Sequence, residues 1–167
     1  GIGVISDTED QPLIIGTHLG NYAIVTVGRI ANLAELVTKA YGLRSAHFTA
    51  MSGGEVNPTE LVALFINQGA TFAEGIQIAQ NAIAGSCSML LLTDDCIYAA
   101  RDKLGRTPII LGRKAEAWAA TLESCAFPNL GYETVRDHLK RIYNKLHVHS
   151  RLEAVAKFKV TQEPDDD

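Results

Sequence analysis

Three cysteines are the side chains of this 167-residue chain best suited to nucleophilic chemistry. A cysteine attacks as a thiolate, and a neighbouring base or cation must lower its pKa for the thiolate to form. Cys87, Cys96 and Cys125 have no histidine beside them, and each stands among residues typical of β-strands. We therefore expect buried, reduced thiols and no catalytic cysteine.

Two groups of charged residues could also contact a ligand. Arg101 and Asp102 are adjacent before a turn, where we expect an ion pair or a carboxylate that accepts hydrogen bonds from the turn. A second group would share one face of a helix, which suits the phosphates of nucleic acid: Arg136, Lys140, Arg141 and Lys145. His147 and His149 lack a third ligand nearby, so we expect neither a metal nor a cofactor.

The elements that would position these residues begin with residues 85–127. Four apolar runs of strand length lie at residues 88–93, 96–101, 109–111 and 118–124, and turn-forming residues separate them. Connections this short cannot join parallel strands, which need a crossover of about a dozen residues. The pattern predicts an antiparallel sheet.

Three helices are expected upstream of this sheet. They begin at Asn32, Asn57 and Thr71, and two strand-like runs precede them at residues 13–15 and 23–27. The first helix has the spacing of a capping box, with Glu35 three residues after the cap, and the second has a proline in its first turn. Helices combined with antiparallel strands predict an α+β sandwich.

A specific family resemblance follows from the strings ARDKLGRTPIILGRK and ATLESCAFPNLGYE. They resemble the glutaminase domain of glutamine phosphoribosylpyrophosphate amidotransferases, whose pattern is close to RDPxGxRPLxLG and then ASE(S/T)xAL. The upstream strings QPL, THLGNYAIVTVGRIANLAEL and SGGEVNPTELVALFI fit the same family in order. The resemblance covers residues 1 to about 133, and it implies a partial αββα fold of the N-terminal-nucleophile hydrolases over residues 1–132.

The resemblance also implies a nucleophile that this chain does not begin with. The family hydrolyses glutamine with an N-terminal cysteine whose own α-amino group serves as the base, whereas this chain starts at Gly1. We therefore expect no catalytic residue, and a glutaminase scaffold that is inactive.

Two further departures fall on positions that, by the resemblance, form the glutamine pocket. The family motif HNGN, whose first Asn and Gly form the oxyanion hole, is matched to His18, Leu19, Gly20 and Asn21. Its motif SDSE, whose Asp holds the substrate amino group, is matched to residues 57–60, beginning with Asn57 and Pro58. Leu19 and Pro58 then replace the two functional side chains, and losing one oxyanion donor lowers the rate by about 10²- to 10³-fold.

Residues 133–158, ETVRDHLKRIYNKLHVHSRLEAVAKF, are similar to the C-terminal half of a LuxR-type helix-turn-helix. The resemblance implies a recognition helix over residues 134–146, a final helix over residues 150–157 with Ser150 as N-cap, and a LuxR-type segment ending at residue 160. It implies DNA contacts from Thr134, Arg136, Lys140, Arg141 and Lys145. No upstream segment resembles the supporting helices of such a domain, and the alternative is that these two C-terminal helices pack on the sheet.

Charge follows the same division of the chain. Residues 1–132 carry 8 basic and 12 acidic side chains, residues 133–160 carry 7 and 3, and the tail 161–167 carries 0 and 4. With 47% hydrophobic residues the chain can bury one sizeable core, and no apolar run approaches the length of a membrane span. We expect a cytoplasmic protein without a membrane partner.

The functional expectation is an inactive amidotransferase-like fragment in a joined or recombined chain. DNA binding through the C-terminal helix is the alternative, and a glutaminase completed by a partner chain is the third possibility. Because N-terminal strands of the family are missing, the open sheet should be covered by self-association or by a partner chain.

Overall fold

The computed structural model describes residues 1–6, 10–42, 51–52, 55–123, 125–127, 133–134, 139–140, 143–145, 147–148, 150 and 153. The chain forms two compact units, Gly1–Ile109 and Ile110–Asp167. This division falls at residue 109, whereas motifs and charge placed the expected boundary at residue 132.

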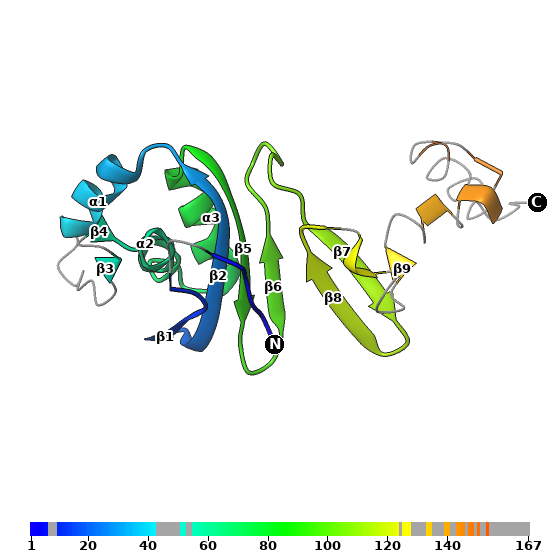
Figure 1. Ribbon diagram of the computed structural model, residues 1–167, viewed down its shortest axis with the longest axis horizontal. Coiled ribbons are helices and arrows are strands. Elements are labelled where there is room, and N and C mark those ends of the chain that lie inside the picture. The colour runs from blue at the N-terminus through cyan, green and yellow to red at the C-terminus, as the bar shows by residue number, and fades with distance from the viewer. Residues whose placement is uncertain are drawn as a thin grey trace, which may run out of the picture. The chain divides into compact units, whose positions relative to one another are not determined.

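An antiparallel sheet of four strands forms the first unit, in the order β1-β2-β5-β6 (Figure 1). The strands are β1 (Leu13–Thr17), β2 (Gly20–Ile30), β5 (Gly85–Leu92) and β6 (Ile97–Ala100). The runs predicted at residues 13–15, 23–27, 88–93 and 96–101 are therefore confirmed as strands. A short hairpin of β3 (Met51–Ser52) and β4 (Glu55–Val56) is separate from this sheet.

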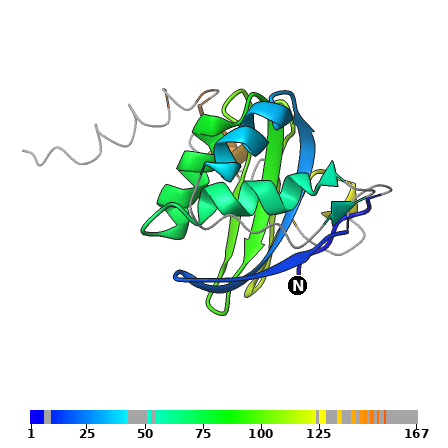
Figure 2. The ribbon, with the colours of Figure 1, turned by 90° about the vertical axis from the view of Figure 1, so that its left-hand side faces the viewer.

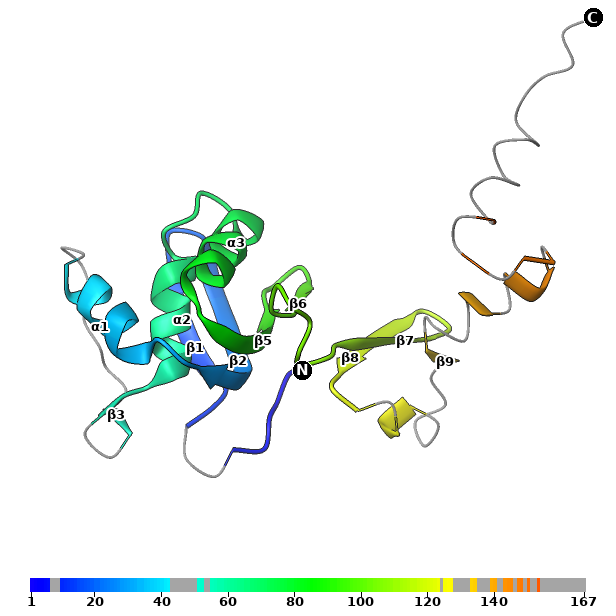
Figure 3. The same cartoon turned by 90° about the horizontal axis from the view of Figure 1, so that it is seen from above.

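Three helices cover one face of the sheet, as Figures 2 and 3 show from two directions. They are α1 (Leu33–Tyr41), α2 (Pro58–Ile66) and α3 (Phe72–Ala82), close to the predicted starts. Asn57 caps α2, because its Oδ1 accepts from the Thr59 amide at 2.8 Å, and the Thr71 hydroxyl caps α3 by accepting from the Glu74 amide at 3.2 Å.

Asn32 occupies the predicted N-cap position of α1, but its side chain makes no cap hydrogen bond to the backbone amides of the helix. Instead the amide group donates to the Ala82 carbonyl at 3.0 Å and accepts from the Ala84 amide at 2.8 Å. The end of α3 leaves backbone groups unpaired, and Asn32 satisfies two of them, which fastens the start of α1 to the start of β5.

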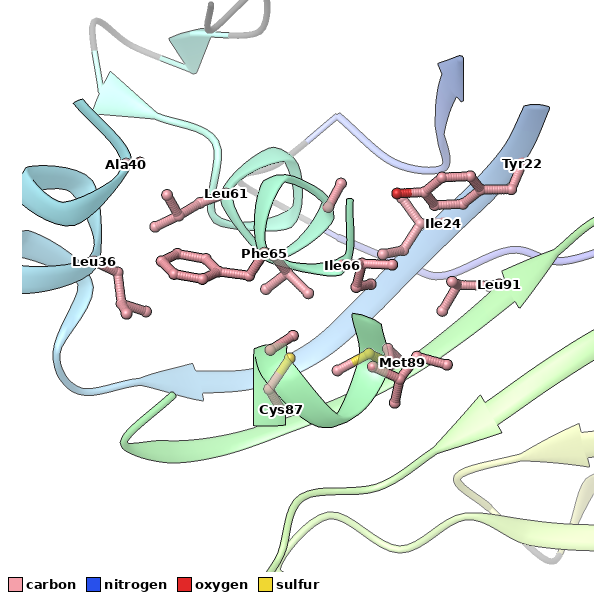
Figure 4. Packing of buried hydrophobic residues seen from close by; sticks show 14 residues of the cluster. Tyr22, Ile24, Leu36, Ala40, Leu61, Phe65, Ile66, Cys87, Met89 and Leu91 are labelled. Carbon is pink, nitrogen blue, oxygen red and sulfur yellow. The ribbon is translucent and has the colours of Figure 1, made fainter. Parts of the chain in front are cut away.

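The hydrophobic core lies between the helices and the sheet (Figure 4). Side chains of Ile24, Met89 and Leu91 from the strands meet Leu61 and Ile66 from α2, and each of these is at most 1% exposed. Seven of the nine residues of α2 are buried, so this helix is the inner element of the layer.

A separate sheet forms in the second unit, in the order β8-β7-β9. Its strands are β7 (Ile110–Lys114), β8 (Ala117–Thr121) and β9 (Glu133–Thr134), and all pairs are antiparallel. The predicted strands near residues 109–111 and 118–124 exist, but they do not continue the sheet of β5 and β6. In the loop between β6 and β7, the amides of Leu104, Arg106 and Thr107 donate to the Asp102 carboxylate.

Thr134 corrects the expected start of the recognition helix. It lies in β9, where its backbone is paired with Gly112 of β7, so it is extended rather than helical. Helical residues in this region are Leu139, Lys140 and Tyr143 to Lys145. A strand pair satisfies backbone groups through a distant segment, which the local helical spacing of residues 134–146 did not indicate.

The cysteines are only partly as predicted. Cys87 is buried in β5, whereas Cys96 and Cys125 are exposed thiols. Cys96 lies in the β5–β6 turn and Cys125 in a turn before Phe127, and turns face solvent. Within the described part of the chain, no helix combines the length and the apolar character needed to cross a membrane.

Candidate functional site

A cavity of about 210 Å³ lies in the first unit, where the end of β2 passes the first residues of α1 and α2. Its wall on β2 is formed by Thr26, Gly28, Arg29 and Ile30. Leu33 opens α1, Pro58 opens α2 and Cys87 belongs to β5, so four elements meet here. This is the place where the predicted pocket residue Pro58 faces an open space.

Two hydrogen bonds hold β2 in place at the cavity, one to α2 and one to the segment before β1. The hydroxyl groups of Thr26 and Thr59 lie 2.5 Å apart, and both residues are buried. The Thr26 amide donates to Oε1 of Gln11 at 2.7 Å, which ties the segment before β1 to the same strand. The fully buried Asn57 fixes the first turn of α2 through its cap, and this sets the position of Pro58.

Gly28 is required at this wall. Its φ is +147°, and a Cβ there would collide with the Ser86 carbonyl of the neighbouring strand. An isolated glycine in a strand often marks such a close approach of two backbones. The residue therefore lets β2 and β5 run close together where they border the cavity.

The first cavity carries a positive charge on its described lining. Of the described residues that line it, Arg29 alone carries a charge, and its backbone amide donates to the Ser86 hydroxyl at 3.2 Å. Cys87 is 3% exposed, and Pro58 offers neither a donor nor an acceptor on its side chain. The described lining residues carry no carboxylate or imidazole side chain.

The structure places the other predicted pocket residues elsewhere. His18, Leu19, Gly20 and Asn21 belong to the β1–β2 hairpin, and none of them lines the cavity beside Pro58. The His18 Nε2 lies 3.0 Å from the Gly69 carbonyl, and the Leu19 amide donates to the Thr17 hydroxyl at 3.1 Å. The His18 contact holds the hairpin against the α2–α3 connection, whereas the Leu19 hydrogen bond lies within the hairpin.

Sequence reasoning missed Thr26, Gly28 and Arg29 as cavity residues. A signal was present, because a glycine inside an otherwise apolar strand pattern indicates a bulge or a close approach. The predicted strand ended at Val27, before Gly28 and Arg29, and only the packing of α2 against β2 brings this segment to Pro58.

Asp102 is the turn-stabilising carboxylate that the sequence predicted. Its oxygens accept from the amides of Leu104, Arg106 and Thr107 at 3.0, 3.2 and 3.1 Å. Burial alone would raise the pKa of Asp102, but these hydrogen bonds and the nearby Arg106 charge outweigh it and hold the pKa below its ordinary value. The carboxylate is therefore ionised and structural.

The C-terminal region contains part of the predicted DNA-binding set. Lys140 and Lys145 are helical and exposed, whereas Arg136 and Arg141 lie outside the described residues. His147 has a φ of +53°, its amide donates to the Asn144 carbonyl, and the Val148 amide donates to the Tyr143 carbonyl, which is the pattern of a helix C-terminus. The Ser150 hydroxyl accepts from the Glu153 amide at 3.2 Å, the cap hydrogen bond that was predicted.

A metal centre was not expected. Groups of three or more His, Cys, Asp or Glu side chains that could hold a metal ion do not occur among the residues with a described position. His147 is exposed, and His149 lies outside that part of the chain.

Comparison with known proteins gives one family match. A family model described as "Glutamine amidotransferase domain" matches residues 2–127. The amidophosphoribosyltransferase of Archaeoglobus fulgidus is 28% identical over 127 residues, which are 76% of this chain and 27% of that protein. Amidophosphoribosyltransferase 3, chloroplastic, of Arabidopsis thaliana is 30% identical over 119 residues, 70% of this chain and 21% of that protein. This chain thus spans about a quarter of the length of such relatives.

Solved structures agree on the fold. Glutamine phosphoribosylpyrophosphate amidotransferase from B. subtilis, complexed with ADP and GMP, matches with a TM-score of 0.65 and 23% identity, over 75% of this chain and 27% of that one. A structure titled as the allosteric regulatory enzyme of purine biosynthesis matches with a TM-score of 0.64 and 23% identity, over 74% and 26%. At this identity the likeness shows a shared fold, the α+β class that the sequence predicts.

Proposed function

Because this chain belongs to the glutamine amidotransferase domain family, we propose that it is an amidophosphoribosyltransferase-like glutaminase domain whose glutamine pocket no longer supports hydrolysis. Its fold is that of N-terminal-nucleophile amidotransferases. The observation that carries the proposal is the cavity at the start of α2, which has Pro58 on its wall.

Pro58 is the first reason to expect no glutamine turnover. The family motif SDSE, matched to residues 57–60, puts Pro58 where a carboxylate would hold the substrate amino group. Proline has no side-chain acceptor, and the charge that lines the cavity is the positive one of Arg29. An ammonium group placed here would be left without a partner and beside a cation, which is unfavourable for a buried charge.

The second reason concerns the oxyanion hole and depends on the register of the HNGN motif. Residues 26–29 read Thr-Val-Gly-Arg, with glycine in the third position, as in HNGN. Thr26, Gly28 and Arg29 of this segment line the same cavity as Pro58, whereas residues 18–21 do not. We therefore match HNGN to residues 26–29, so that Val27 rather than Leu19 stands in place of the donor. Either register puts an apolar side chain there, and the expected loss of rate is the same.

Restoring the family's Asn and Asp side chains tests this proposal through glutamine binding, which does not require a nucleophile. The chain should show no saturable calorimetric signal with L-glutamine at concentrations of about 1 mM. Val27→Asn combined with Pro58→Asp should gain at least about tenfold in affinity, since each restores a polar contact to the ligand. Leu19→Asn combined with Pro58→Asp is the matched control for the other register. Tight glutamine binding by the unmodified chain, or ammonia release from glutamine, would contradict the proposal.

DNA binding is a second proposed function, supported by the helix end at His147 and the cap at Ser150. The described residues of this region also include Lys140 and Lys145, which are helical and exposed. Duplex DNA should then bind at low salt, with an affinity that falls steeply as salt is raised. Equal binding by the chain and by its Lys140→Ala/Lys145→Ala variant would speak against it.

We also propose an origin and a mode of assembly for the chain. A joined or recombined chain would account for two resemblances that meet near residue 133, and a partner chain or a second copy would cover the open sheet. Mixing this chain with a fragment that bears an N-terminal cysteine should then restore glutaminase activity only if the pocket is competent. No activity in the mixture is the result that the altered pocket predicts.

A further inference from the structure

A second cavity, of about 280 Å³, lies in the first unit, and Cys87 is the residue it shares with the first. Three segments enclose it: the end of α3 with Gln80 and Ile83, the start of β5 at residues 84–87, and residues 102–106 of the loop after β6. None of these segments has a part in the glutamine pocket proposed above, apart from Cys87.

The loop on this cavity is held in one conformation. Inside the loop, Asp102 accepts three backbone amides, and the Gly105 amide donates to the Asp102 carbonyl at 2.9 Å. At its two ends, Gln80 Nε2 donates to the Arg101 carbonyl at 2.6 Å, and the Ser88 hydroxyl donates to the Thr107 carbonyl at 2.8 Å. A binding loop fixed in advance loses little conformational entropy when a ligand arrives.

The fixed loop presents two cations to the cavity. Lys103 and Arg106 are exposed, and in the described part of the chain neither forms an ion pair with a carboxylate. Asp102 is the acid that lines the cavity, but it is 7% exposed and its oxygens already accept three hydrogen bonds. The donors that remain for a ligand are therefore the ammonium and guanidinium groups.

The floor of the cavity is apolar. Ile83 and Ala84 line it beside the buried Cys87. A ligand that fits both parts has an anionic end against the loop and a small apolar body against the floor. A phosphate monoester is close to a dianion at neutral pH, and the planar fork of an arginine pairs with two of its oxygens.

We propose that this cavity binds a small phosphate monoester, with the phosphate on Arg106 and Lys103 and the organic group on Ile83 and Ala84. Titration of the chain with phenyl phosphate, followed by calorimetry, tests it. Binding should saturate, should be tighter than for inorganic phosphate because of the apolar floor, and should be tighter than for benzoate because of the second charge. The affinity should fall as salt is raised.

Variants locate the site. Lys103→Met/Arg106→Met, which keeps the apolar stems, should weaken phenyl phosphate binding by about tenfold or more. Arg106→Lys keeps the positive charge but removes the planar guanidinium group, and it should give an intermediate loss of affinity. Lys39→Met/Arg113→Met removes the same number and kinds of cations at positions that line neither cavity, and should bind as the unmodified chain does. Melting curves of all variants check that the fold is kept.

Three results would overturn the proposal. The first is unchanged binding by the Lys103→Met/Arg106→Met variant while its melting curve is normal. The second is the absence of saturation at concentrations up to about 10 mM. The third is equal affinity for benzoate, which would make the loop a general anion site rather than a phosphate site.

Discussion

The hydroxyl groups of Thr26 and Thr59 lie 2.5 Å apart and join the inner strand β2 to the first turn of α2. Thr26 is 9% exposed and Thr59 is fully buried, so this hydrogen bond is shielded from water. It holds the strand that carries Gly28 and Arg29 against the helix that begins with Pro58. The first cavity depends on this contact, because its two walls belong to segments more than twenty-five residues apart in the chain.

Removing this hydroxyl pair one partner at a time should destabilise the first unit. Thr26→Val deprives the buried Thr59 hydroxyl of this partner, and we expect a loss of about 1–3 kcal/mol in the free energy of unfolding. Urea unfolding followed by circular dichroism measures it. The double variant Thr26→Val/Thr59→Val should lose less than the sum of the two single variants, because the two hydroxyls act on each other. Strict additivity would show that they are not coupled.

The N-cap of α2 should contribute measurably to the stability of the first unit. Asn57→Ala removes the acceptor for the amides of Thr59 and Glu60, and we expect a loss of about 1–2 kcal/mol in the free energy of unfolding. Asn57→Ser keeps a capping oxygen and serves as the matched control, with a smaller loss expected. Equal losses in the two variants would assign the effect to the packing of Asn57 instead of to its cap.

Asp102 should make stability depend on pH in the acid range. Its pKa in the folded chain is lowered from the ordinary 3.8, so its contribution is complete above that value. It is lost as the pH falls from there through the folded pKa. Asp102→Asn should therefore lower the melting temperature at pH 7. The difference from the unmodified chain should shrink below a pH of about 4. A difference that stays constant with pH would mean that the charge of Asp102 contributes nothing.

Gly28 should not tolerate a side chain. In Gly28→Ala the methyl group would collide with the Ser86 carbonyl, and its φ of +147° is unfavourable for alanine, so we expect a loss of more than about 2 kcal/mol. Gly20→Ala is the control, because Gly20 also has a positive φ, +105°, but has open space around it. Denaturant unfolding of both separates the collision from the backbone strain. Equal losses would refute the close approach of β2 and β5.

Local sequence determined the elements and several of their ends. The start of α2 at Asn57 and Pro58, the turn built on Asp102 and the hydrogen bond between Ser150 and Glu153 all involve residues within about five positions of each other. Caps and turns are satisfied by near neighbours, so residue type and spacing are enough to predict them. The α+β class followed from the same local patterns.

The tertiary structure alone decided which of these elements meet. Asn32 has the residue type of a cap, but its side chain bonds to the end of α3 instead. Thr134 was expected to begin a helix, but β7 pairs with its backbone. The cavity brings residues 26–29 to Pro58, whereas the motif pattern pointed to residues 18–21. Each outcome depends on a contact between segments that are far apart in the chain. The free energy of such a contact competes with the local conformational preference of the residues, and no fixed spacing in the sequence reveals the contact.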